Sequence, residues 1–242
     1  MGLTIHFKLR APQGTDASRA EEIMTQLRKR ASYEWIEGRV DGAPRLGRDA
    51  QALRLGRSFR SYPVPDLPHS SYEAELVPVE GFVLAVKVGR DCEPLYLGLA
   101  RYPETVWAGG KMRRTNLHGW RWIGFCKTQF ASLHGWEYFR RCHLAVLGLL
   151  EAARELGCRV TVSDEGEYWP RRNEAALRRN VGMMNCAIAG AAGAMKDFDG
   201  EKGAAGVQSP IFAHPQFEHL EAKGAAQAHV AALRNALGSA SR

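Results

Sequence analysis

The hydrophobic pattern of the chain opens with a strand followed by a helix. Residues 3–9 alternate apolar and polar side chains, which is the period of a strand with one buried face. Apolar residues at 20, 23, 24, 27 and 31 then recur at helical spacing, so this stretch predicts a helix that ends near Gly38. Ser18 and Glu21 have the spacing of a capping box at the start of that helix.

The rest of the chain mixes strands and helices without regular alternation. Apolar or β-branched runs predict strands at 75–79, 82–88, 95–100, 120–130 and 159–162, and helical spacing predicts helices at 135–157, after Asn173, and at 217–238. Strict alternation of strand and helix would indicate a parallel sheet, and it is absent here. We therefore predict an α+β fold, with a mostly antiparallel sheet and helices packed on one face.

One domain is expected over residues 1–242, because 45% of the chain is hydrophobic and its length suits one large core. Two parts of the chain stand apart from this core. Residues 38–71 are rich in Gly, Pro and Arg, which predicts an irregular basic insertion. Residues 217–238 predict a helical extension at the C-terminal end of the domain.

The cysteines and the apolar runs predict a cytoplasmic protein. The five cysteines are odd in number and widely spaced, and they contain no C-x-x-C pair, so we expect reduced and mostly buried thiols. The most apolar stretch, 187–195, is too short for a membrane helix, and the N-terminus has no signal-peptide pattern.

The chain is basic, with a net charge of +7 and a pI of about 9.3. This balance favours an anionic partner, which includes nucleic acid, a nucleotide or a small anion. The same charge also serves solubility alone, so it does not choose among these classes.

Two polar segments, each at the end of an apolar strand, are the first candidates for a site. Lys127 can bind phosphate or carry a proton, while Thr128 and Gln129 can orient a ligand through hydrogen bonds. Asp164 and Glu165 can divide acid and base roles or hold a divalent metal such as Mg²⁺. The alternative is that these two acids only stabilise the turn before the next helix.

Four further residues complete the candidate site. His143 lies on the apolar stripe of the helix at 135–157, where it is either a proton carrier or a hydrogen-bonded core residue. Arg141 is a candidate clamp for carboxylate or phosphate. Trp122 and Tyr168 are the aromatic candidates for contact with the ligand.

Familiar nucleotide and hydrolase motifs do not occur. Gly109-Gly110-Lys111 lacks the first glycine and the final Ser or Thr of a P-loop, and no dinucleotide or G-x-S-x-G motif is found. The sequence thus predicts a pocket that binds, or binds and transforms, a polar anionic small molecule or nucleotide, and leaves open whether the protein is an enzyme.

Two other classes of function stay open. Residues 38–60 and 111–122 interleave cations with aromatic rings, a composition suited to binding nucleic acid through charge and stacking. The third possibility is a non-catalytic interaction protein of the immunity type, which an exposed apolar patch would favour.

Four segments together resemble a family of uncharacterised bacterial proteins. They are Leu3–Phe7, Phe125–Ser132, Phe139–Leu144 and Val162–Gly166. The resemblance extends over about 95–196 and the first strand. It implies that the polar segments belong to one architecture, and it implies no activity.

Overall fold

The computed structural model describes residues 3–65, 67, 69–169, 171–202 and 208–239, with the backbone alone described at 197–202 and 232–239. The chain forms two compact units, each described by itself below. One unit contains residues 5–126 and 142–163, and is called the sheet unit here. The other contains residues 1–4, 127–141 and 164–242, and is called the helical unit.

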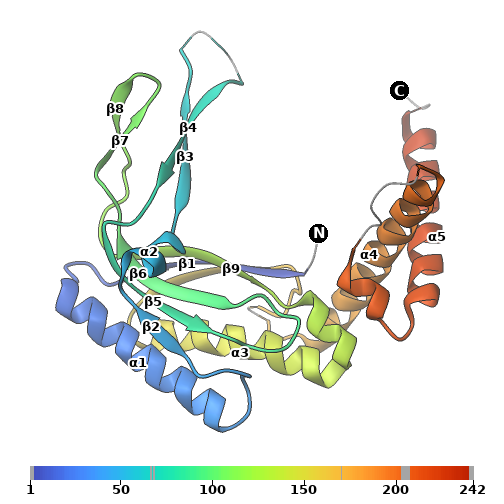
Figure 1. Cartoon of the computed structure of the whole chain (residues 1–242), viewed down its shortest axis with the longest axis horizontal. Helices are drawn as coiled ribbons and strands as arrows, with labels where there is room; N and C mark the ends of the chain where they lie inside the picture. The colour runs from blue at the N-terminus through green and yellow to red at the C-terminus, as the bar shows by residue number, and fades with distance from the viewer. Residues whose placement is uncertain (1–2, 66, 68, 170, 203–207, 240–242) are drawn as a thin grey trace. The chain divides into compact units, whose positions relative to one another are not determined.

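A six-stranded sheet is the centre of the sheet unit, and its strand order is β10-β1-β9-β6-β5-β2 (Figure 1). Its strands are β1 (Thr4–Arg10), β2 (Arg45–Gly47), β5 (Glu80–Val86), β6 (Leu95–Arg101), β9 (Arg121–Lys127) and β10 (Arg159–Asp164). The β2–β5, β5–β6 and β6–β9 pairs are antiparallel. The predicted α+β class with a mostly antiparallel sheet is therefore confirmed.

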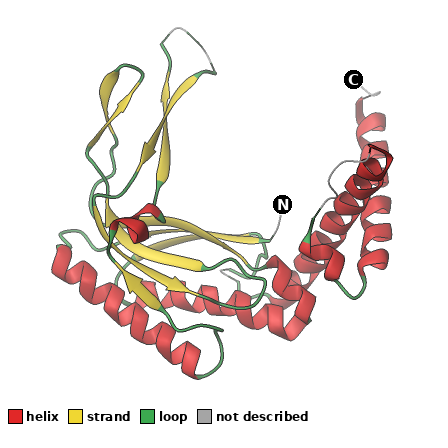
Figure 2. Ribbon diagram, in the orientation of Figure 1, coloured by secondary structure: helices red, strands yellow, loops and turns green. Residues whose placement is uncertain are grey.

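Long helices cover one face of this sheet, as Figure 2 shows by colour. Helix α1 (Ala17–Ile36) buries its predicted apolar stripe, which consists of Ala20, Ile23, Met24, Leu27 and Ala31. Helix α3 (Trp136–Glu155) lies along the same face over its sheet-unit residues (Figure 1). Gly135 (φ 93°) precedes α3 and Gly157 (φ 90°) follows it, both with left-handed backbone, and Gly157 is the glycine expected where a helix ends.

The segment 38–71, expected to be an irregular insertion, contains regular elements. These are β2, the short helix α2 (Ala50–Arg54) and strand β3 (Ser58–Pro63). Asp49 caps α2 by accepting a hydrogen bond from the Ala52 N–H at 2.8 Å. Part of this segment is thus built into the sheet, since β2 pairs with β5.

Two hairpins extend from the sheet, next to each other (Figure 1). Strand β3 pairs with β4 (Ser71–Leu76), and β7 (Thr105–Ala108) pairs with β8 (Lys111–Arg114). The guanidinium of Arg113 lies 5.4 Å from the ring centroid of Tyr62 and 5.7 Å from that of Tyr72, so it ties one hairpin to the other.

The helical unit is built around α4 (Glu174–Lys202) and α5 (Phe217–Ser239), which pack against each other. Gly190 and Gly224 face one another, and a Cβ on Gly190 would lie 2.8 Å from the Gly224 carbonyl carbon. Small residues thus permit the close approach of the two helices. The predicted C-terminal helix at 217–238 is confirmed to within one residue.

All five cysteines are free thiols; Cys126, Cys142, Cys158 and Cys186 are buried, and Cys92 is half-buried. Their burial agrees with the expectation of mostly buried thiols. Among the described residues, no helix combines the length and the apolar character that crossing a membrane requires.

Candidate functional site

The two polar segments singled out in the sequence meet at the beginning of β1, within the helical unit. The Thr128 N–H donates to the Leu3 carbonyl at 3.3 Å, and the Glu165 N–H donates to the Thr4 carbonyl at 3.1 Å. The chain at Leu3 and Thr4 therefore lies between the segment 127–129 and the segment 164–165.

In the segment 127–129, the Gln129 side chain holds the backbone. The buried Gln129 accepts a hydrogen bond from the Leu3 N–H at 3.0 Å through Oε1, and its Nε2 donates to Asn185 Oδ1. Asn185 Nδ2 in turn donates to Ser132 Oγ at 3.1 Å. Thr128 is fully buried as well. This is a connected polar network that joins β1, the segment after β9 and helix α4.

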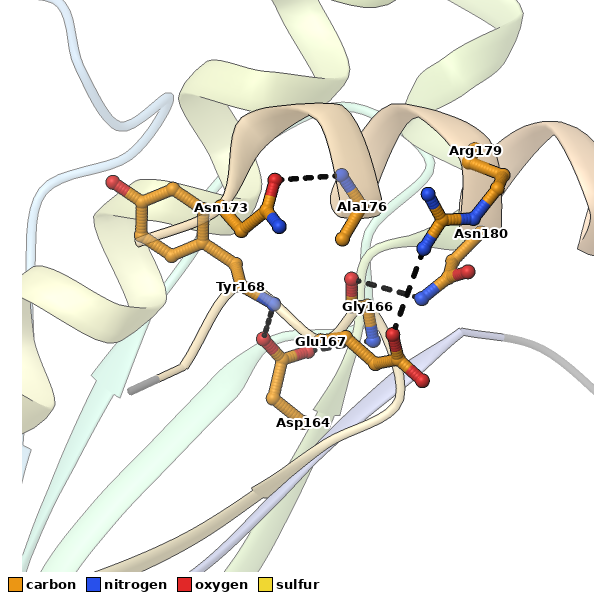
Figure 3. Close-up of polar contacts among 8 residues, drawn as sticks. All are labelled: Asp164, Gly166, Glu167, Tyr168, Asn173, Ala176, Arg179 and Asn180. Atoms are coloured by element: carbon orange, nitrogen blue, oxygen red, sulfur yellow. Dashed lines mark hydrogen bonds and ion pairs between the residues drawn. The ribbon is translucent and has the colours of Figure 1, made fainter. Parts of the chain in front are cut away.

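Asp164 and Glu165 likewise bind backbone amides. Asp164 Oδ1 accepts from the Gly166 N–H at 2.8 Å, and Oδ2 accepts from the Tyr168 N–H at 2.9 Å (Figure 3). Oδ2 also accepts from the Trp169 N–H at 3.0 Å. Glu165 Oε2 accepts from the Thr4 N–H at 2.8 Å. Three amides around one carboxylate fix the loop after β10, which is the arrangement of a structural turn.

The loop after β10 is also anchored to α4. Asn180 Nδ2 donates to the Gly166 carbonyl at 3.2 Å, and Asn173 caps the helix by accepting from the Ala176 N–H at 3.0 Å (Figure 3). Tyr168 lies 5.7 Å from the Arg172 guanidinium, and Arg141 lies 4.6 Å from the ring of Tyr138. These two candidate ligand contacts are therefore part of cation–π pairs within the helical unit.

Two of the predicted site residues lie in the sheet unit. His143 is fully buried on α3. Trp122 is also fully buried, donates from Nε1 to the Tyr96 carbonyl at 2.8 Å, and packs against Gly56 and Gly98. Within the described residues, no three His, Cys, Asp or Glu side chains are grouped so as to hold a metal ion. The catalytic and metal-binding roles stay predictions.

A different surface of the sheet unit has the features of a binding site. Strands β1, β9 and β10 alternate buried and more exposed positions. His6, Lys8 and Arg10 of β1 share one face, and Ile123 and Phe125 of β9 share that face with them. His6 and Phe125 confirm the alignment, because their ring centroids are 6.1 Å apart. We call this surface the open face.

Two adjoining hollows lie on the open face. One has a volume of about 460 Å³ and is lined by β1, β9 and β10 together with Arg57 and Phe59. The other, of about 540 Å³, is lined by α2, β9 and the residues around Tyr96. Arg57, Ile123, Gly124 and Phe125 line both hollows. The hollows therefore form a single groove that crosses β9.

Large apolar side chains are exposed along this groove. Phe59 is 61% exposed, Phe125 51%, Ile123 44% and Leu55 44%. Exposed apolar residues gathered in one concave patch mark an interaction surface, whereas single scattered ones do not. Gly124 lies between Ile123 and Phe125 in β9, and a Cβ on it would point to the opposite face of the strand, 2.7 Å from the buried Phe7 ring.

The charge of the groove is positive. Its lining includes Lys8, Arg54 and Arg57, and the one carboxylate among its described lining residues is Glu93. Arg57 has a long contact of 3.8 Å with Glu75, in which both side chains are well exposed. Such an exposed pair is weak and leaves Arg57 able to bind an external anion.

The sequence contained part of the signal for this surface. The alternation at residues 3–9 already placed His6 and Lys8 on a solvent-facing side, and Arg54 and Arg57 lie in the basic segment 38–60. For Phe125 the sequence predicts only a place in the strand at 120–130, because the run Trp122–Cys126 gives no sign of which face is covered.

The chain was compared with protein-family models, with curated proteins and with solved structures, and none of them matches it.

Proposed function

We propose that the protein binds single-stranded nucleic acid on the open face of its sheet unit. The observation that carries the proposal is the combination of exposed Phe59 and Phe125 rings with Lys8, Arg54 and Arg57 in one groove. Single-strand binders use this pairing, since the rings stack on bases while the cations follow the phosphates.

The cations favour a nucleic acid over an apolar protein partner. The cores of protein–protein interfaces are depleted in charged residues, and Lys in particular is rare there. The groove instead places Lys8 and Arg57 directly beside exposed apolar side chains. The polyanionic backbone of a nucleic acid neutralises these charges at the same time as its bases cover the rings.

The exposed rings favour a single strand over a duplex. Bases in a duplex are stacked on one another, so their faces are not available to a protein ring. Unpaired bases can be splayed out onto Phe125 and Phe59, which stand 51% and 61% exposed. This contact does not depend on the base, and we expect little sequence preference.

A salt titration tests the proposal. Fluorescence anisotropy of a labelled 12-nucleotide strand is measured with the full chain between 20 mM and 300 mM salt. Three phosphate contacts, from Lys8, Arg54 and Arg57, predict a slope of log K against log salt of about −2, and Arg57→Gln makes it shallower by about 0.7. No binding at the lowest salt would refute the proposal.

A mononucleotide or another small anion is the second candidate ligand. It is favoured by the size of each hollow, since about 460 and 540 Å³ fall in the range of small-molecule sites. The length of the ligand separates the two candidates. A groove for a strand gives affinity that rises from one nucleotide to about eight, while a nucleotide pocket gives an affinity independent of added length.

A further inference from the structure

Arginines gather where β1 ends and β9 begins, at one end of the open face. Arg10 is the last residue of β1, and Arg121 is the first of β9. Next to them, the Ala11 N–H donates to the Trp120 carbonyl at 2.9 Å. The bond from the Thr128 N–H to the Leu3 carbonyl lies the same number of residues further along each strand, so the two bonds belong to one register. Arg10 and Arg121 therefore lie opposite each other in an antiparallel pair. Alternation along the strands puts both on the face of His6 and Phe125.

Arg60 of β3 is the third member of this cluster. Its Nε and Nη2 donate to the Thr115 carbonyl at 2.9 and 2.6 Å, which fixes the guanidinium in position. Arg121 is held in the same way, since its Nε donates to the His118 carbonyl at 3.2 Å. Burial, and after it the positive charges of Arg10 and Arg60, lower the pKa of Arg121. The positive charges of Arg10 and Arg60 thus both act on the Arg121 guanidinium.

No carboxylate balances this charge within the described part of the chain. Arg10, Arg60 and Arg121 form no ion pair there, whereas Arg101 on the neighbouring strand β6 contacts Glu80 at 3.5 Å. Like charges that are close and partly shielded from water repel one another. An anion bound between them would replace this repulsion with charge-assisted hydrogen bonds.

We infer that the cluster of Arg10, Arg60 and Arg121 binds the terminal phosphate of the strand that occupies the open face. This inference rests on the proposed function. A phosphodiester carries a single negative charge, while a terminal phosphomonoester carries about −1.5 to −2 at neutral pH. Three guanidinium groups match the higher charge, and their planar donors suit phosphate oxygens. The position at the end of the face suits the end of a strand.

Binding of chemically defined strand ends tests the inference. Otherwise identical 8-nucleotide strands carry a 5′-phosphate, a 3′-phosphate or hydroxyl groups at both ends, and their dissociation constants are measured with the full chain. One phosphorylated form is expected to bind about tenfold more tightly than the hydroxyl form, as a charge-assisted contact to arginine provides. Which of the two does so identifies the end that the cluster holds.

Two variants from the same strand and face separate the cluster from the general charge of the groove. Arg10→Gln is expected to remove the preference for the phosphorylated end. Lys8→Gln is the matched control, and it is expected to weaken all three strands while the preference persists. Equal affinities for all three strands in the unmodified protein would overturn the inference and leave the proposed function standing. Failure of every strand to bind would overturn both.

Discussion

Truncation of Phe125 is the most informative single change, because it removes a stacking surface from the middle of the groove. The ring is 51% exposed, and the His6 ring lies beside it at a tilted 42°. Stacking of a base on an aromatic side chain contributes about 1–3 kcal/mol. With half of the ring open to a base, we expect about 1.5–2 kcal/mol. Phe125→Ala should therefore raise the dissociation constant of an oligonucleotide about 10- to 30-fold.

The same substitution should have a small effect on folding. Full burial of a Phe side chain stabilises a protein by about 1.5–3 kcal/mol, so the buried half of this ring contributes about 1 kcal/mol. For a chain of this length, such a loss lowers Tm by about 2–4 °C. Thermal unfolding monitored by circular dichroism shows whether the variant is still folded at the temperature of the binding assay.

Two control variants identify the cause of the loss. Trp35→Ala truncates an aromatic residue that is 45% exposed on α1, the helix on the opposite face of the sheet, and it should leave oligonucleotide binding unchanged. Phe125→Leu keeps an apolar side chain but removes the ring, so it should bind almost as weakly as Phe125→Ala. Unchanged affinity of a folded Phe125→Ala protein would refute the stacking argument. Unchanged affinity of Phe125→Leu would mean that Phe125 makes only a general apolar contact with the strand.

The remaining predictions concern stability and pH. Asp164→Ala removes the acceptor of three backbone amides and should lower the free energy of unfolding by about 3 kcal/mol in a urea titration; a loss below 0.5 kcal/mol would contradict its role as a turn anchor. Gly98→Ala places a Cβ 2.5 Å from the Trp122 ring and should cost about 1–3 kcal/mol in the same assay, so a neutral result would mean that the ring is not fixed. Burial raises the pKa of Tyr102 to about 12, so the stability contributed by its neutral form is complete below pH 10 and is lost as the pH rises toward 12. Absorbance at 295 nm should show a late titration step that Tyr102→Phe removes, and a step that persists in this variant would contradict the assignment.

Local patterns in the sequence predicted the main elements well. The period-two pattern at residues 3–9 corresponds to β1, and the apolar stripe of α1 is buried residue by residue as expected. The start of α1 was misplaced, because Asp16 and not Ser18 caps the helix by accepting from the Arg19 N–H at 2.8 Å. Asp and Ser are nearly equal as N-caps, so the local sequence could not choose between them.

Long-range contacts could not be predicted in this way. The packing of the β3–β4 hairpin beside the β7–β8 hairpin depends on the contacts of Arg113 with Tyr62 and Tyr72. These two tyrosines are far from Arg113 in the sequence. Gln129 was expected to face a ligand, yet its partners are Leu3 and Asn185. A polar residue at a strand end looks the same in sequence whether it binds a ligand or the backbone of its own protein.

The open face was partly hidden for a related reason. Exposure of Phe125 follows from which face of β9 the helices cover, and the sequence of that strand alone does not contain this information. The basic residues of the groove come from Lys8 and from the segment around Arg57, and only the fold brings them to the same hollow.

Photo-crosslinking tests the central claim most directly, since it reports where a strand lies on the protein. A short strand that contains 5-bromouridine is irradiated with the full chain at low salt, and the crosslinked peptides are identified by mass spectrometry. We predict crosslinks in peptides that contain Phe59 and Phe125. Crosslinks confined to the loop 164–169 or to α1, with none on the open face, would contradict the account.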